Sequence, residues 1–109
     1  MTAEELNTHT RKVACLRDMR RKRDALTSSE AIAHDVAVLD AEILALDHDL
    51  AESARRIERY VESIEDTWTR VLFRLHYVNG LSWSETAHAV GGNTKDSVRM
   101  ACKRYICSQ

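Results

Sequence analysis

The sequence contains no proline, and all three of its glycines lie between residues 80 and 92. Proline and glycine are the residues that most often interrupt helices, so no strong helix breaker occurs in the first 79 residues. Aromatic residues are few, and no stretch shows the alternation of apolar and polar residues that is typical of strands. Together with abundant Ala, Leu, Arg, Glu and Asp, these absences predict an all-α protein.

Other absences exclude further classes of protein. No stretch approaches the roughly 20 consecutive apolar residues of a membrane span, and the polar start lacks the apolar core of a signal peptide. Cys15, Cys102 and Cys107 form no CxxC pair. We therefore expect a cytoplasmic protein with reduced thiols, no membrane contact, no metal and no cofactor. The histidines form no HxxxH pair and are interpreted as solvated helix residues: His9, His34, His48, His76 and His88.

Charge divides the chain into three segments. The overall net charge of −1 is distributed as +3 over residues 1–29, −8 over residues 30–66 and +4 over residues 67–109. This division indicates segments with different partners. A chain of 109 residues is long enough for one small domain, or for a small head on a helical arm.

Residues 1–65 are predicted to form such an arm. The sequences TAEE (Thr2–Glu5) and TSSE (Thr27–Glu30) match the capping box, in which a Thr oxygen and a Glu carboxylate cap the start of a helix. The first helix is expected over residues 3–26, and the second from about residue 28. Only a short turn separates them, so we expect a long antiparallel hairpin resembling a coiled coil.

A heptad pattern indicates how the second helix packs. Apolar residues recur every seven positions from Val36 to Val78, which is typical of a coiled-coil seam. Ala37, Leu44 and Ala51 form a parallel row beside the seam. Because one short helix cannot cover both rows, we expect a homo-oligomer, with a dimer favoured. Replacement of the seam residues Ile43 and Leu50 by Asp is expected to dissociate or unfold it.

The basic run RRKR, Arg20–Arg23, has two interpretations. It is either a solvated helix face paired with the acidic second helix or a clamp for nucleic acid.

Residues 66–109 are predicted to form a head of three short helices. The first is expected to bury Trp68, Val71, Leu72 and Leu75 and to end at Asn79–Gly80. A third capping box, SWSE at residues 82–85, starts the next helix, whose predicted buried residues are Trp83, Thr86, Ala87 and Val90.

Gly91–Gly92 ends that second short helix, and Asn93 or Thr94 is expected to cap the last one. The last helix runs toward Ile106, and its predicted buried residues are Val98, Ala101, Cys102 and Tyr105. Two short helices joined by a tight glycine turn predict a helix-turn-helix, and the small Ala87 lets them approach closely.

The segment LFRLHYVNGLSWSETAHAVGGNTKDSVRMACKRYI, residues 72–106, resembles a known family. It is similar to the helix-turn-helix of sigma-factor region 4, and more closely to small phage and prophage regulators of the RinA/ArpU type. The turn is a residue longer than is usual there, and Thr86 stands where an aliphatic residue is commoner. The resemblance implies a DNA-binding transcription regulator whose head is able to dock on RNA polymerase. The matching residues are Leu75, Tyr77, Gly80, Leu81, Ser82, Trp83, Ala87, Val90, Gly91, Val98, Arg99 and Arg104.

The outward face of the last helix supplies the residues expected to contact double-stranded DNA. Arg99 is the best candidate for a guanine contact, and Met100 for a thymine methyl group. The remaining candidates suit phosphates or the cap of the helix, where backbone N–H groups attract anions. An ordinary solvated face is the other interpretation. The full candidate set is Asn93, Thr94, Lys95, Asp96, Ser97, Arg99, Met100, Lys103 and Arg104.

These observations lead to a DNA-binding transcription regulator of phage or prophage type as the leading functional hypothesis. The alternative is a protein-interaction or assembly module built on the arm, either an RNA polymerase-docking factor or a phage packaging component. An enzyme is the weakest hypothesis, because no nucleophile–base pair, glycine-rich phosphate loop or metal-ligand spacing occurs.

Overall fold

The computed structural model of the protein describes residues 1–27 and 29–108, and this part of the chain is helical and without strands. The prediction of an all-α protein is confirmed. The elements are α1 (Ala3–Ala25), a 3-10 turn (Glu30–Ile32), α2 (Ala33–Glu62), α3 (Thr67–Phe73), a π turn (Arg74–Val78), α4 (Trp83–Val90) and α5 (Lys95–Cys107).

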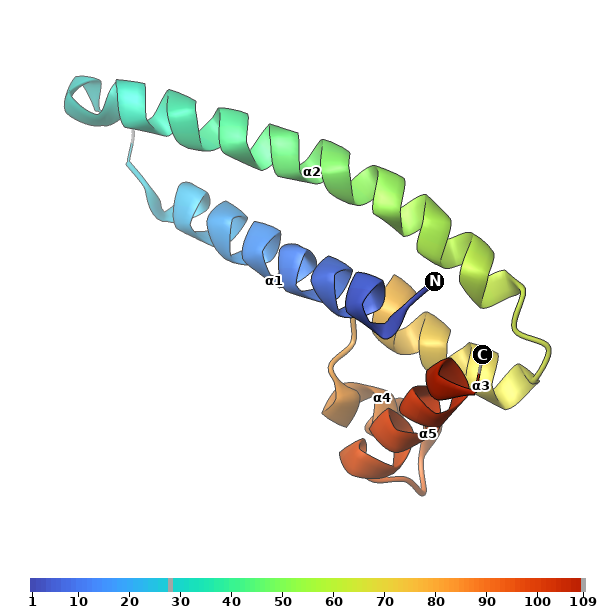
Figure 1. The fold of residues 1–109 in the computed structure, drawn as a ribbon. Helices are drawn as coiled ribbons and strands as arrows, with labels where there is room; N and C mark the ends of the chain where they lie inside the picture. The colour runs from blue at the N-terminus through green and yellow to red at the C-terminus, as the bar shows by residue number, and fades with distance from the viewer. Residues whose placement is uncertain (28, 109) are drawn as a thin grey trace.

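The molecule is elongated, with principal extents of 54 × 26 × 17 Å. In Figure 1, α1 and α2 run side by side in opposite directions, and α3, α4 and α5 gather where α2 ends and α1 begins. The chain therefore has one slender end, formed by α1 and α2 alone, and one thicker end to which every helix contributes.

The starts of α1 and α2 differ from the predicted capping boxes. Thr2 accepts a hydrogen bond from the Glu5 N–H at 3.1 Å, but the Glu5 carboxylate pairs with Arg56 of α2 instead of turning back to Thr2. The second predicted box includes Ser28, which lies outside the described residues. Ser29 makes no side-chain cap bond, and α2 begins at Ala33 after the 3-10 turn, later than the sequence predicted.

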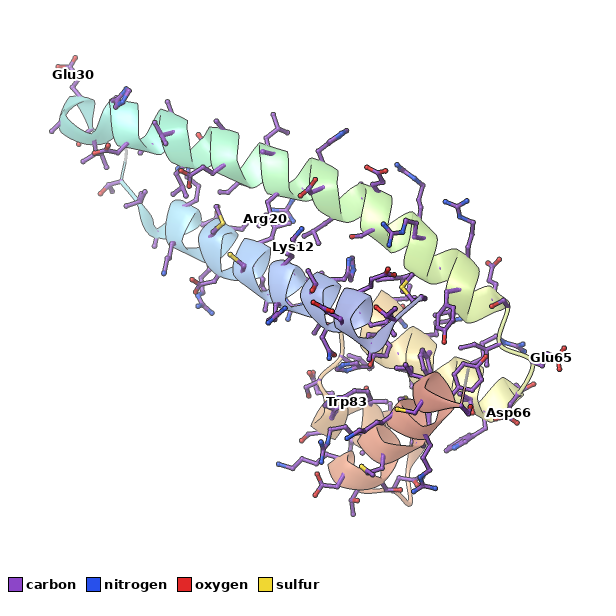
Figure 2. The ribbon with its side chains drawn as sticks, in the orientation of Figure 1. Lys12, Arg20, Glu30, Glu65, Asp66 and Trp83 are labelled. Atoms are coloured by element: carbon purple, nitrogen blue, oxygen red, sulfur yellow. The ribbon has the colours of Figure 1, made fainter. Side chains whose placement is uncertain are left out.

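Ion pairs join α1 to α2 along their length. Figure 2 shows Lys12 and Arg20 on the side of α1 that faces α2. Arg21 and Lys22 both pair with Asp18 inside α1. The pairs between α1 and α2 lie at the surface, so each contributes little, but together they favour this pairing of the two helices. The interhelical pairs are Lys12–Asp49, Arg20–Asp47, Arg23–Asp40 and Arg56–Glu5.

The heptad seam of α2 is turned inward. Leu50 and Ile57 are buried, Val36 and Ile43 are half-buried, and the seam ends at the buried Ile64. The expected continuation to Val71 does not occur, since α2 stops at Glu62 and Val71 is exposed. The seam packs within the chain. Replacement of Ile43 and Leu50 by Asp would therefore test whether the chain folds, and not whether two chains associate.

One apolar core joins the helical pair to the short helices. Phe73 lies at its centre, with ring centroids 6.0 Å from Tyr60, 5.2 Å from Tyr77 and 5.5 Å from Tyr105. The core is continuous across residue 65, and the division into 1–65 and 66–109 stays a prediction. Its buried members are Leu6, Ile57, Val61, Ile64, Leu72, Phe73, Tyr77, Ala87, Val98 and Cys102.

The predicted buried face of α3 is wrong in part. Trp68 and Val71 were expected to be buried, but they are 48% and 38% exposed. The helix instead buries the face that carries Leu72 and Phe73, because the aromatic rings of α2, the π turn and α5 surround Phe73. A pattern of apolar residues alone does not show which of two adjacent apolar faces has the better partners.

Two leucines of opposite environment test this core. Leu72 is 1% exposed and Leu44 is 71% exposed. We expect Leu72→Ala to lower the free energy of unfolding by about 2–5 kcal/mol, because it removes buried methyl groups and leaves a cavity, and Leu44→Ala to change it by less than about 1 kcal/mol. Urea unfolding followed by circular dichroism, at low protein concentration, measures both. Equal losses would contradict the assignment of the core.

Candidate nucleic-acid interface

The predicted capping box of α4 is confirmed. The Glu85 N–H donates to the Ser82 hydroxyl at 3.0 Å, and the Ser82 N–H donates to the Glu85 carboxylate at 3.0 Å. The Ser82 N–H that donates to the Glu85 carboxylate is the largest cause that holds the pKa of this carboxyl below its usual value. With its start fixed in this way, α4 buries Thr86 and Ala87 against the core and half-buries Trp83, as predicted.

The turn between α4 and α5 depends on glycine. Gly91 and Gly92 have φ angles of +69° and +65°, in the left-handed region that side chains other than glycine rarely adopt. The Asn93 side-chain amide donates to the Gly91 carbonyl at 2.9 Å, and Thr94 accepts from the Ser97 N–H at 3.1 Å. Thr94 is thus the N-cap of α5, while Asn93 braces the turn.

Helix α5 packs against α3 and α4 along one face. Val98 and Cys102 are each 1% exposed, and Ala101 and Tyr105 are half-buried, as the sequence predicted. Burial raises the pKa of the Cys102 thiol to about 12, so this side chain acts as a small apolar residue in the core. The opposite face of α5 is left to solvent.

The structure brings all the candidate DNA-contact residues to the exposed surface of the turn and of α5. They lie at different positions around α5, because the helical period puts Asp96, Met100 and Lys103 near the middle of its exposed face. Arg99 lies at its edge, and both Arg99 and Lys103 line a hollow of about 380 Å³ between α5 and the start of α1. The Arg99 guanidinium is 3.4 Å from the Asp96 carboxylate.

This surface is positively charged. Residues 67–109 contain two acidic residues, Glu85 and Asp96, and Glu85 is engaged in the cap of α4. Within the described residues, no ion pair involves Lys95, Lys103 or Arg104. An exposed helix face with unpaired cations is suited to phosphate groups.

The interpretation of all five histidines as solvated is wrong for two of them. His76 is 8% exposed, donates from Nδ1 to the Leu81 carbonyl at 2.7 Å and stacks on Trp83 with ring centroids 3.5 Å apart. His9 is 6% exposed, and its Nδ1 lies 2.6 Å from the Ser53 hydroxyl. Burial is the largest cause that lowers the pKa of each imidazole.

The sequence carried a signal for both buried histidines. His9 is three residues after Leu6 and seven before Leu16, on the stripe of α1 that faces inward. His76 is four residues after the buried Leu72. Helical spacing places such residues with the core, whatever their side-chain chemistry.

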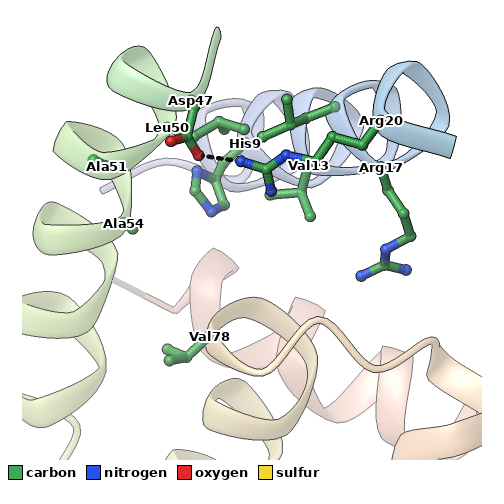
Figure 3. A pocket seen from close by; sticks show the side chains of 10 residues that line it. His9, Val13, Arg17, Arg20, Asp47, Leu50, Ala51, Ala54 and Val78 are labelled. Carbon is green, nitrogen blue, oxygen red and sulfur yellow. Dashed lines mark hydrogen bonds and ion pairs between the residues drawn. The ribbon is translucent and has the colours of Figure 1, made fainter. Parts of the chain in front are cut away.

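A second hollow, of about 430 Å³, lies between α1, α2 and Val78. Figure 3 shows His9, Arg17 and Arg20 around it, with Arg20 paired to Asp47. His9 is held by Ser53 in the same region. Two of its polar groups therefore already have partners within the chain.

The described residues contain no group of three or more His, Cys, Asp and Glu side chains that could hold a metal ion. None of the helices in this part of the chain is both long and apolar enough to cross a membrane. No family model, curated protein or solved structure matches the chain.

Thr86 offers a test of how tightly α4 is enclosed. Its side chain is fully buried, and its hydroxyl makes no hydrogen bond in the described part of the chain. We expect Thr86→Val to raise the free energy of unfolding by about 1 kcal/mol, because it removes an unsatisfied polar group while keeping the shape. Thr69→Val is the matched control, and it should be destabilising because the Thr69 hydroxyl donates to Asp66 at 2.7 Å. Loss of stability in Thr86→Val would mean that the hydroxyl has a partner.

The buried histidines predict a dependence of stability on pH. Their pKa values are lowered in the folded state, so the unfolded chain binds more protons near pH 6. Their contribution to stability is therefore present above about pH 6.5 and is lost as the pH falls below it. Urea unfolding between about pH 7 and pH 5 should show this loss.

Substitution identifies which histidines are responsible. We expect the double variant His9→Gln, His76→Gln to flatten the dependence, whereas His88→Gln, at an exposed position of α4, should leave it unchanged. An unchanged slope in the double variant would exclude both buried histidines as its source.

Proposed function

We propose that the chain is a DNA-binding transcription regulator in which α4 and α5 form a helix-turn-helix. In this proposal residues 1–65 are a helical hairpin that serves as an arm, and residues 66–109 are the head that binds duplex DNA. The observation that carries it is the combination of two capped helices, a turn with two left-handed glycines, and an exposed face of α5 on which Lys95, Lys103 and Arg104 form no ion pair with any described residue. The resemblance to sigma region 4 and to phage regulators of the RinA/ArpU type agrees with it.

The exposed face of α5 suits the major groove, which accommodates one α-helix. Lys95, Lys103 and Arg104, which form no ion pair within the described residues, are assigned to phosphates. Met100, near the middle of the face, is assigned to a thymine methyl group. Backbone N–H groups at the start of α5, beside Asn93 and Thr94, are assigned to a further phosphate.

Arg99 is assigned to a guanine base, but it must first leave Asp96. That ion pair is exposed on both sides and is therefore weak, so a bidentate contact to guanine, worth about 1–3 kcal/mol of discrimination, outweighs it. Release of Asp96 has a second effect, since a carboxylate in this position is able to accept from a cytosine amino group. Asp96 and Arg99 are thus proposed to read neighbouring bases.

A protein-interaction or assembly role is the second candidate function. The observation that favours it is apolar surface away from α5, including Leu44 and Trp68. In this case the chain would be an RNA polymerase-docking factor or a packaging component of a phage. Strong association with protein partners and no measurable affinity for duplex DNA would favour this function over the first.

The DNA proposal predicts different roles for Arg99 and Lys103. Selection from random duplexes first supplies a preferred site, and binding is then measured on matched and altered duplexes over a series of salt concentrations. We expect Arg99→Ala to flatten the preference between these duplexes, since planar guanidinium groups read base edges. Lys103→Ala should weaken binding to both duplexes about equally and lower the log–log salt slope by roughly one unit.

Two outcomes would contradict the proposed function or the proposed role of Arg99. No preferred duplex and no salt-dependent binding would remove the proposed function. Binding with an intact preference in Arg99→Ala would leave DNA binding in place but exclude α5 residue Arg99 as a base reader. Arg11→Ala is the control for loss of charge alone, because Arg11 is an exposed cation of α1 and outside the proposed interface.

A further inference from the structure

The hollow between α5 and the start of α1 has the size and the walls of a small-molecule site. In Figure 1 the later turns of α5 lie near the first turn of α1. The hollow measures about 380 Å³, within the range of roughly 300–1,000 Å³ that is usual for ligand pockets. Trp83, Ile106 and Ala3 supply apolar wall, and the Trp83 indole is held in place because it stacks on His76.

Tyr77 lines the hollow and has a hydroxyl group without a partner. The residue is 7% exposed, and its hydroxyl makes no hydrogen bond within the described residues. A buried tyrosine hydroxyl usually has a partner. Burial, and after it the proximity of Cys102, raises the pKa of Tyr77, so the hydroxyl lies on the side of the ring toward α5. This hydroxyl is therefore available to a ligand.

Two cations of α5 make the hollow positive. Lys103 forms no ion pair within the described residues, and Arg99 pairs weakly with Asp96, since both are exposed. Lys103 and Arg99 are one helical turn apart, a spacing at which like charges repel. None of the described residues that line the hollow is acidic, and Glu4 of α1 lines a neighbouring hollow instead. An anion between Lys103 and Arg99 would relieve their repulsion.

We propose that the hollow binds a small organic acid, which has a carboxylate and an aromatic or aliphatic body. The carboxylate accepts hydrogen bonds from Lys103, Arg99 and the Tyr77 hydroxyl. The body packs against Trp83 and Ile106. The DNA backbone offers an anion but no such body, so a small acid suits this hollow better than a phosphate of DNA. The proposed acid site goes beyond the proposed function and does not depend on it.

The first test uses phenylpropionate as the probe and the full chain. Binding is followed by the NMR signals of the two indole N–H groups. Trp68, which is 48% exposed on α3 and does not line the hollow, is the internal control for Trp83. We expect the Trp83 signal to shift and the Trp68 signal to stay, with a dissociation constant of about 1–5 mM, which is usual for a ligand of about 11 non-hydrogen atoms.

Two further probes separate the charge of the acid from its body. Phenylpropanol has the same body without the charge, and inorganic phosphate has charge without the body. Each should bind at least about ten times more weakly than phenylpropionate. Equal binding of phenylpropanol would overturn the role of the cations, and equal binding of phosphate would overturn the role of the apolar wall. No shift of Trp83 at about 20 mM phenylpropionate, or an equal shift of Trp68, would overturn the site.

Substitutions locate the site. We expect Lys103→Gln to raise the dissociation constant of phenylpropionate about tenfold, because it removes a charge-assisted hydrogen bond. Lys95→Gln is the matched control, since Lys95 is an exposed lysine of the same helix outside the hollow, and it should leave the constant unchanged. Equal effects of the two variants would mean that only overall charge matters, which would overturn the site.

Tyr77→Phe tests the hydroxyl. We expect it to raise the dissociation constant of phenylpropionate about fivefold and to leave the urea midpoint of unfolding unchanged, because the hydroxyl has no partner within the described residues. A lower urea midpoint, or an unchanged dissociation constant, would overturn the assignment of this hydroxyl to the ligand.

Occupation of the hollow has a consequence for DNA, and this step rests on the proposed function. Lys103 and Arg99 are assigned to DNA as well, so the acid and the duplex should exclude each other. At constant total sodium and about ten times the dissociation constant of phenylpropionate, we expect the apparent dissociation constant of the preferred duplex to rise about tenfold.

The two kinds of failure are distinguishable. A chain that binds no duplex would remove the proposed function, whereas the NMR titration would still support the acid site. Duplex binding that phenylpropionate does not weaken would overturn the shared use of Lys103 and Arg99.

Discussion

The burial of Phe73 among Tyr60, Tyr77 and Tyr105 is the contact on which the arrangement of the helices depends. These rings come from α2, α3 with its π turn, and α5, so one cluster fixes three elements relative to one another. Leu6 of α1 belongs to the same core. A chain of this size has little apolar material, and gathering it in one place gives the short helices a stability that none has alone. The slender end of α1 and α2 is held by the half-buried seam and exposed ion pairs.

The sequence predicted the features that arise from neighbouring residues. The cap of α4 by Ser82 and Glu85, the turn at Gly91 and Gly92, and the inward side of α5 all follow from short-range hydrogen bonding, backbone freedom and helical period. The seam of α2 from Val36 to Ile64 follows from its period as well. Such patterns are local, so they can be recognised without knowing which other helix each residue packs against.

The predictions failed where the burial of a residue depends on which distant side chains it contacts. Trp68 and Val71 are apolar and were expected to be buried. Leu72 and Phe73 are buried instead, and Phe73 packs against the aromatic rings of the core. His9 and His76 were assigned to solvent from their polarity, whereas Ser53 and the Leu81 carbonyl satisfy them inside the protein. Glu5 fits a capping box by its spacing, yet Arg56 of α2 competes for its carboxylate. For the DNA interface, the exposed residues of α5 were predictable, but the hollow that Arg99 and Lys103 share with the start of α1 was not, because it depends on how α1 docks.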